Sequence, residues 1–300
     1  MENYDLIVVG AGPAGLNAAV YAARYKLNIL VIGKITGGVM LGAIKICNWL
    51  GYIETSGMEL TEKMAEQVKD AGVEIKNQKV VDVKKIEGGF LVKTDTEEYQ
   101  SKKIILATGS ERRKLNLDYE EELLGKGISY CPTCDAVFFS DQIVGVVGGG
   151  DAALTAALLI SEYARKVYIF YRQDSFFRAE PAWVEAVERE EKIEIIFKVN
   201  VAELLGTDKL EGVKLDNGQE IELGGLFIQI GGMPNIELAV QLGVKLSGRY
   251  IEVDKEQKTS VPGVFAAGDI TNNPLKQIIT AAAEGAVAAT SAYKEIKEEG

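Results

Sequence analysis

The sequence has no histidine, and only three of its 300 residues are cysteines. Without histidine, no imidazole is available as a metal ligand, a general base or a phosphate contact. Three cysteines are too few for a disulfide-stabilised scaffold and suit a reducing compartment. No run of about 18 apolar residues occurs, and no basic leader precedes the first apolar run. We therefore expect a soluble, cytoplasmic protein with no metal site and no membrane partner.

Positive charge is also in deficit. The chain has 33 Lys and Arg against 44 Asp and Glu, a formal net charge of −11. This balance argues against nucleic acid or an anionic membrane as a partner. The length is comfortable for two domains, each able to bury its own core. Glycine is plentiful, with 32 residues, which fits many tight turns and close backbone approaches to ligands.

Two glycine fingerprints are present, each after an apolar run and before an alanine-rich helical pattern. They are Gly10-Ala11-Gly12-Pro13-Ala14-Gly15 and Gly148-Gly149-Gly150-Asp151-Ala152-Ala153. In a strand–turn–helix unit the first glycine permits the tight turn, the second lets a pyrophosphate approach, and the third small residue allows close helix packing. The helix amino end then faces the phosphates. The sequence therefore predicts two dinucleotide sites. The acidic ribose contact frequent after the second strand is missing from the first unit, where Gly33 and Lys34 stand.

Between the fingerprints lies Cys131-Pro132-Thr133-Cys134-Asp135. Two cysteines three residues apart at the start of a helix can close a small disulfide ring, and the helix amino end stabilises a thiolate. Asp135 is placed to move a proton to or from that thiolate. Half of a zinc site is the competing interpretation, but three cysteines without histidine make none of the usual four-ligand sets within one chain. The arrangement suggests that electrons pass from one dinucleotide to another and on to the thiol pair.

Apolar periodicity and turn signals predict the remaining elements. A β-meander is expected from strands at 73–83 and 90–93, and a small-residue turn with one carboxylate at 264–269. The chain is expected to leave the second domain near 238–243. Other strands are expected at 6–9, 27–32, 103–108, 143–147, 166–171, 193–197, 211–215 and 226–230, and helices at 58–71, 154–163 and 276–297.

In this order and spacing the motifs resemble those of the low-molecular-weight thioredoxin reductases, flavoproteins of the pyridine nucleotide–disulfide oxidoreductase group. The resemblance covers essentially the whole chain. Besides both fingerprints and the cysteine pair, it rests on Gly37-Gly38, Ala107-Thr108-Gly109, Gly268-Asp269 and Gln277.

The resemblance implies an α/β fold with two Rossmann-like dinucleotide-binding domains, the second inserted into the first. The FAD-binding domain would comprise residues 1–113 and 243–300, and the nicotinamide-binding domain with the CxxC motif residues 114–242. It implies a flavin-dependent disulfide reductase that takes electrons from NADPH or NADH. Thioredoxin or a thioredoxin-like protein would be the substrate, and the assembly a homodimer.

The resemblance also implies which residues bind the cofactors. FAD contacts are expected from Gly10, Gly12, Pro13, Ala14, Gly15, Gly33, Lys34, Gly37, Gly38, Val39, Asn48, Val80, Thr108, Gly109, Gly268, Asp269, Lys276, Gln277 and Ile278. Nucleotide contacts are expected from Gly148, Gly150, Asp151, Ala152, Ala153, Arg172, Gln173 and Arg178.

By the same resemblance, Cys134 receives electrons from FAD and Cys131 exchanges with the protein disulfide. Asp269 would bond the ribityl chain, Asn48 would lie close to the flavin, and the amino end of the final helix would favour negative charge on reduced flavin. The linkers near 111–114 and 238–243 would act as hinges.

Three departures from the family pattern bear on function. Val39 replaces a glutamine and cannot supply amide hydrogen bonds, and Leu50 replaces a proline after Asn48-Trp49. The family's NADPH run of histidine, two arginines and a later arginine is represented by Tyr171-Arg172-Gln173 and Arg178. One cation is lost, and no acidic residue ends the strand to select NADH. We expect weak discrimination between the nucleotides or poor use of both. Cys47 has no partner left, because Cys131 and Cys134 pair with each other, and it is expected to be a buried structural thiol.

Two other functions remain open from the sequence. One is an enzyme of the same build with another donor, such as reduced ferredoxin. The other is a flavin-binding redox sensor that uses the disulfide as a switch. Turnover of a disulfide substrate separates the sensor from the enzymes.

Overall fold

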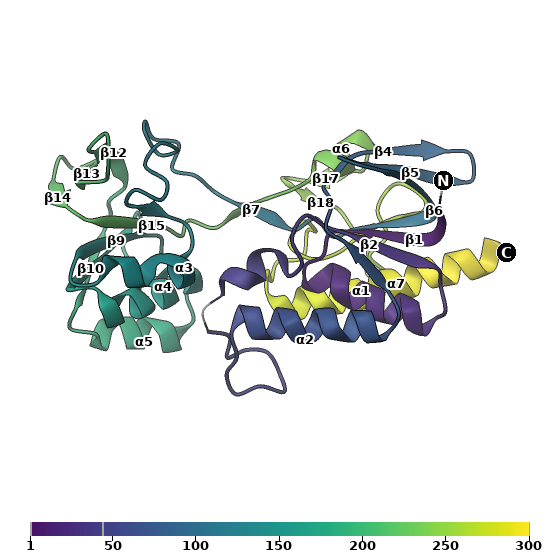
Figure 1. Ribbon diagram of the computed structural model, residues 1–300, viewed down its shortest axis with the longest axis horizontal. Helices are drawn as coiled ribbons and strands as arrows, with labels where there is room; N and C mark the ends of the chain where they lie inside the picture. Colours follow the sequence, from purple (N-terminus) through teal and green to yellow (C-terminus); the bar gives the residue numbers. More distant parts are fainter. Residues whose placement is uncertain (1, 44, 300) are drawn as a thin grey trace. The chain divides into compact units, whose positions relative to one another are not determined.

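A computed structural model describes residues 2–43 and 45–299. The chain divides into two compact units (Figure 1). The first comprises Met1–Leu41, Ile46–Glu111 and Pro234–Gly300, and the second Gly42–Lys45 and Arg112–Met233. Each contains a sheet with a parallel core and its own helices. The predicted fold class, with one Rossmann-like domain inserted into another, is confirmed.

The sheet of the first unit is organised by β1 (Asn3–Val9), which is buried on both faces. Leu6 and Val8 belong to one core cluster, and Ile7 and Val9 to the other. This double burial explains the continuous apolar run, since a strand covered on both sides needs no polar alternation. The strand order is β3-β2-β1-β6-β5-β4, and β19 also pairs with β6. Their bounds are β2 Ile29–Ile32, β3 Glu74–Lys76, β4 Val80–Ile86, β5 Gly89–Thr94, β6 Glu98–Leu106 and β19 Val264–Ala266.

Parallel pairing of β1, β2, β6 and β19 brings the carboxyl ends of these strands to one edge of the sheet. The strands end at Val9, Ile32, Leu106 and Ala266. In open α/β sheets, ligands bind outside this edge.

The segment 73–83 differs from its prediction as part of the meander. It forms two strands: β3 pairs in parallel with β2, and only β4 joins the antiparallel meander with β5 and β6. The polar residues 77–79 interrupt the pairing, and β3 extends the parallel sheet instead.

Three helices cover one face of this sheet (Figure 1): α1 (Pro13–Arg24), α2 (Gly57–Asp70) and α7 (Ile278–Glu299). α1 and α7 pack closely because small residues face each other. A Cβ added at Gly285 would lie 2.0 Å from the Ala14 carbonyl oxygen. The high alanine and glycine content of α7 is therefore explained by its close contact with α1.

The second unit contains the five-stranded parallel sheet β11-β10-β9-β15-β8. Helices α4 and α5 pack into a core cluster on one face, and the small antiparallel sheet β12-β13-β14 contributes to the cluster on the other. α5, β12 and β14 had no counterpart in the sequence prediction. The bounds are β8 Ile128–Ser129, α3 Pro132–Asp135, η2 Ala136–Phe139, β9 Ile143–Val147, α4 Asp151–Tyr163, β10 Lys166–Tyr171, α5 Pro181–Arg189, β11 Ile193–Phe197, β12 Val201–Leu205, β13 Gly212–Leu215, β14 Glu220–Glu222 and β15 Gly225–Ile228.

The chain passes between the units through β7 (Ser110–Arg112) and β16 (Gly232–Pro234), which pair with each other. The second passage therefore comes earlier than the predicted 238–243. The reason is α6 (Glu237–Gln241), whose Leu238 and Ala239 are buried in the first unit's core with residues of β4, β5 and β6. The remaining elements of this unit are η1 Gly38–Gly42, β17 Leu246–Ser247 and β18 Tyr250–Ile251. Within the described residues, no helix is long and apolar enough to cross a membrane.

Candidate active site

Cys131 and Cys134 form a disulfide with an S–S distance of 2.11 Å. The pair opens α3, and the backbone N–H groups of Cys134 and Asp135 both donate to the Cys131 carbonyl oxygen at 3.1 Å. The Cys134 side chain is exposed. The predicted helix start is present, but α3 has only four residues and continues as the short 3-10 helix η2. Few peptide dipoles are therefore aligned behind the cysteines, and the helix stabilises a thiolate less than the sequence suggested.

The residues before Cys131 are held by buried polar contacts. The Tyr130 hydroxyl bonds to the Glu120 carboxylate, which also accepts backbone N–H groups of Leu115 and Asn116. Burial and Glu120 together raise the pKa of Tyr130. Glu120 is 3% exposed, and these partners satisfy its charge. This anchor, which the sequence did not indicate, gives Cys131 a rigid support.

Asp135 lies beside the pair, and its Oδ2 accepts a hydrogen bond from the Ser129 hydroxyl at 2.6 Å. The same Ser129 oxygen accepts the Cys131 backbone N–H at 2.9 Å. Ser129 was missed by sequence reasoning, although a hydroxyl two residues before a redox cysteine was visible in the sequence.

The first glycine turn lies at the ligand-binding edge of the first sheet, between β1 and α1. Gly10 has φ +119°, and a Cβ there would lie 2.0 Å from the Ala107 carbonyl oxygen. Gly12 is the N-cap residue of α1, so no side chain accepts a hydrogen bond from the first N–H groups of the helix. The first turn has no acidic residue either. A Cβ added at Gly12 would meet nothing within 4 Å. The helix N–H groups thus face open space without a competing acceptor. This geometry fits a dinucleotide phosphate.

Other predicted FAD residues gather around this turn. The Gly37 N–H donates to the Ala11 carbonyl at 2.7 Å, which places Gly37 and Gly38 beside the turn. Gly33 follows β2, and Thr108 and Gly109 follow β6 shortly after its end. The Thr108 hydroxyl donates to the Asn235 carbonyl at 2.6 Å.

A second group meets at the start of α7. Asn48 Nδ2 donates to Gln277 Oε1 at 3.2 Å. Asp269 follows Gly268 after β19, and burial raises the pKa of its carboxyl, although Lys276 and a hydrogen bond with Ser110 oppose this. Burial lowers the pKa of Lys276.

Four predicted FAD residues differ in their exposure. The Val80 side chain packs against the meander core, and Ala14 is buried against α7. Val39 is 50% exposed. Lys34 is exposed too. Cys47, predicted to be buried, is an exposed free thiol; it lies in the loop next to Ile46, whose apolar side chain is buried in its place.

The second glycine turn lies at the carboxyl edge of the second sheet, between β9 and α4. Gly148 has φ +142°, Gly150 caps α4 without a side-chain hydrogen bond, and a Cβ at Gly150 would meet nothing within 4 Å. A pyrophosphate therefore fits here as well. β15 runs parallel to both β9 and β8, so these strands end at the same edge of the sheet. The cysteine pair follows the end of β8 and therefore lies at this edge too. Gln229 contacts both the second glycine turn and the residue before the cysteine pair. Its carbonyl oxygen lies against Gly148, and its Nε2 donates to the Tyr130 carbonyl at 3.1 Å.

The predicted nucleotide-selecting residues are dispersed around the end of β10. Arg172, Gln173 and Arg178 are exposed. The Arg178 guanidinium lies 5.3 Å from the Phe177 ring centre. Tyr171, where the family has histidine, is buried with its ring against Gly149.

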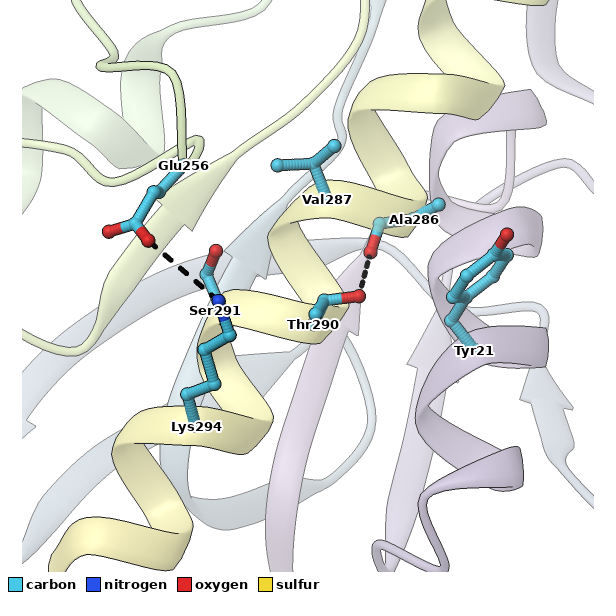
Figure 2. Close-up of a pocket in the computed structure, with 7 residues that line it drawn as sticks. All are labelled: Tyr21, Glu256, Ala286, Val287, Thr290, Ser291 and Lys294. Carbon is cyan, nitrogen blue, oxygen red and sulfur yellow. Dashed lines mark hydrogen bonds and ion pairs between the residues drawn. The ribbon is translucent and has the colours of Figure 1, made fainter.

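A separate hollow of about 280 Å³ lies between α1, α7 and the loop that carries Glu256 (Figure 2). Figure 2 shows Tyr21 on α1 and Thr290, Ser291 and Lys294 on α7. None of the residues that line the hollow is a predicted site residue.

Comparison with known proteins decides the family. The family model "Pyridine nucleotide-disulphide oxidoreductase" matches residues 4–285. The chain belongs to this family. A thioredoxin reductase of Listeria monocytogenes is 37% identical, over 98% of this chain and 94% of that protein. The crystal structure of Lactococcus lactis thioredoxin reductase superposes with a TM-score of 0.94 at 36% identity, covering 98% of this chain and 99% of that one. A ferredoxin-flavin thioredoxin reductase from Clostridium acetobutylicum is 32% identical, with a TM-score of 0.55 and 99% of each chain covered.

As a member of the pyridine nucleotide–disulphide oxidoreductases, the protein is an enzyme. It is a flavin-dependent disulfide reductase with FAD and a nicotinamide nucleotide as cofactors.

Proposed function

We propose that the enzyme reduces the disulfide of thioredoxin or a thioredoxin-like protein. The observation that carries this proposal is the Cys131–Cys134 disulfide, formed on a rigid support with Cys134 exposed. Once it is reduced, an exposed dithiol pair of this kind can exchange with a disulfide on another protein. The thioredoxin reductases among its relatives support the identity of that protein.

We assign FAD to the first unit and the nicotinamide nucleotide to the second. The uncapped α1 amino end at Gly12, together with Gly37 and Asp269, supports the first assignment. The uncapped α4 amino end at Gly150 supports the second. Bound FAD supplies a two-electron relay between the nucleotide and the disulfide.

The thiol residues have distinct proposed roles. Two electrons and one proton open the disulfide and leave one thiol and one thiolate. The Cys131 thiolate attacks the substrate disulfide, which forms a mixed disulfide and releases one substrate sulfur as thiolate. Cys134 then loses its proton to Asp135 and attacks Cys131 Sγ, which restores the enzyme disulfide and releases the second substrate sulfur. One proton from Asp135 and one from solvent complete the two substrate thiols.

The electron donor has a second candidate. The incomplete cation run at Arg172, Gln173 and Arg178 weakens the case for NADPH, and the similarity to a ferredoxin-flavin thioredoxin reductase favours reduced ferredoxin as the alternative. We also infer a homodimer and a cytoplasmic location, the latter from the low cysteine count. We place the hinge between the domains at the paired linkers β7 and β16.

Anaerobic titration tests this proposal. The purified protein is expected to be yellow, to contain non-covalent FAD and one disulfide per chain, and to reduce thioredoxin catalytically. Flavin absorbance is followed on addition of NADPH, NADH or reduced ferredoxin, and thioredoxin thiols are counted. A colourless protein that cannot be reconstituted with FAD, or one that never reduces thioredoxin with any donor, contradicts the proposal.

A further inference from the structure

Ser129 connects the two chemical groups of the redox site. It is the last residue of β8 and only 2% exposed. Its hydroxyl donates to Asp135 Oδ2 at 2.6 Å, and its oxygen accepts the Cys131 backbone N–H at 2.9 Å. One side chain therefore contacts both the acid–base candidate and the backbone of the cysteine proposed to attack the substrate.

The direction of these bonds is fixed by their donors. A backbone N–H can only donate, so the Cys131 N–H must use a lone pair of the Ser129 oxygen. An ionised carboxylate can only accept, so the single hydroxyl hydrogen of Ser129 points to Asp135. The hydroxyl proton is thus committed to the carboxylate.

Ser129 is itself held firmly. It pairs with Phe227 of β15 in the parallel sheet. The next residue, Tyr130, is bonded at its carbonyl by Gln229 and at its hydroxyl by Glu120. A hydroxyl on so rigid a support fixes the direction of its acceptor.

We propose that Ser129 is a positioning residue for the thiol chemistry, which orients the Asp135 carboxylate toward the cysteine pair while it holds the Cys131 backbone. The inference rests on the proposed acid–base role of Asp135. One carboxylate oxygen is bonded by Ser129, and the other exchanges the proton with Cys134. If the Ser129 hydroxyl only accepted the Cys131 backbone N–H at the end of β8, its removal would lower the stability of the fold and would not act through Asp135.

A single-turnover assay measures the thiol steps without a nucleotide donor or thioredoxin. The assay uses Cys47→Ser, because the exposed Cys47 thiol would itself react with the reagent. The FAD-containing protein is reduced with dithiothreitol, desalted anaerobically and mixed with one equivalent of 5,5′-dithiobis(2-nitrobenzoate). The first 5-thio-2-nitrobenzoate released reports attack of the enzyme thiolate on the reagent, and the second reports closure of the Cys131–Cys134 disulfide. We expect closure in Ser129→Ala to be roughly ten- to a hundredfold slower, as for loss of a hydrogen bond to a charged group.

Two comparisons isolate the hydroxyl. Ser129→Thr keeps the hydroxyl and Ser129→Val replaces it with a methyl of similar shape, so we expect closure to be faster in the threonine variant. Ser161→Ala removes an equally buried serine hydroxyl from α4, bonded to the Leu158 carbonyl, and should close at the wild-type rate. If Ser129→Ala does not fold, the threonine and valine pair carries the test.

A double-mutant cycle decides whether Ser129 acts through Asp135. We expect Ser129→Ala to slow closure little further once Asp135→Asn is present. Equal slowing in both backgrounds, equal rates for the threonine and valine variants, or wild-type closure in Ser129→Ala would overturn the inference. A wild-type protein that closes normally here but never reduces thioredoxin refutes the proposed substrate and leaves Ser129 standing.

Discussion

The Glu284 carboxylate on α7 accepts the backbone N–H of Gly268 at 2.8 Å. The same carboxylate accepts the Thr271 hydroxyl at 2.9 Å and the Asn273 amide at 2.5 Å. Glu284 is only 5% exposed. One buried side chain thus holds three donors of the loop that follows β19, and Asp269 lies within that loop.

Replacing Glu284 by alanine is expected to loosen this loop. Its three donors would lose their acceptor, and each buried unpaired group costs about 1–3 kcal/mol. We expect the free energy of unfolding to fall by about 2–5 kcal/mol and FAD content to drop. Thermal unfolding and the flavin-to-protein absorbance ratio measure both. Glu298→Ala, at an exposed position of the same helix, is the control; equal losses in the two variants would refute the role of Glu284.

The two cysteines should give different defects. Cys131→Ser is expected to abolish thioredoxin reduction while reduction of the flavin by the donor survives. Cys134→Ser should stop electron flow from the flavin to the thiol pair. Stopped-flow flavin absorbance together with steady-state thioredoxin reduction distinguishes the two. Cys47→Ser changes the exposed free thiol and should behave as wild type. Wild-type turnover in either redox-cysteine variant would show that the roles are assigned wrongly.

Asp135→Asn is expected to slow the thiol steps by roughly 10²–10⁴, the usual contribution of a positioned acid–base group. FAD content should not change, because Asp135 is in the second unit. The rate of thioredoxin reduction across a pH series measures the effect. Near-normal rates throughout would reduce Asp135 to a residue that only accepts the Ser129 hydroxyl.

Local patterns predicted the parts of the fold that local forces decide. β1 from Leu6, β9, and β10 from Val167 are continuous apolar runs because both faces are buried. The glycine turns after β1 and β9 need backbone angles that favour glycine. α5 also had usable signals, with Pro181 at its first position and Val184 and Val187 on one face.

Contacts between distant segments escaped prediction. Glu284 and Glu120 are buried only because their donors arrive from loops that the sequence cannot place. β3 and α6 were misassigned for the same reason, since each is stabilised by packing on strands far from it along the chain. Cys47 shows the converse error, because an apolar-looking thiol lies on an exposed loop.

Asp269 links stability to pH. Burial raises the pKa of its carboxyl above the ordinary value of 3.8, so the folded protein without FAD binds this proton more tightly than the unfolded chain. The charged carboxylate therefore destabilises the FAD-free fold above the raised pKa, and the penalty disappears below 3.8. We expect FAD-free Asp269→Asn to melt at a higher temperature than wild type at neutral pH, and the gap to close as the pH falls. FAD should bind about tenfold more weakly to the variant. A gap that widens on acidification would contradict this account.

The prediction that is easiest to refute concerns the electron donor. A charge-assisted bond to the 2′-phosphate of NADPH contributes about 1.5–3 kcal/mol, so the missing second arginine should weaken NADPH binding by roughly ten- to a hundredfold. Arg172 and Arg178 are both exposed, and Tyr171 turns its ring against Gly149 instead of offering a cation. No Asp or Glu ends β10 to bind the free ribose hydroxyls of NADH.

We therefore expect weak discrimination between NADPH and NADH, or poor use of both, in steady-state kinetics. Gln173→Arg should restore a second adjacent cation and lower the KM for NADPH by about tenfold, because one charge-assisted bond returns. The KM for NADH should stay unchanged, since NADH has no phosphate at that position. Gln173→Ala is the control and should alter neither KM. The Asp151 carboxylate accepts the Glu180 N–H at 2.7 Å, which ties the backbone two residues after Arg178 to the start of α4. A wild-type preference for NADPH above roughly a hundredfold, with micromolar affinity, would show that Arg172 and Arg178 suffice.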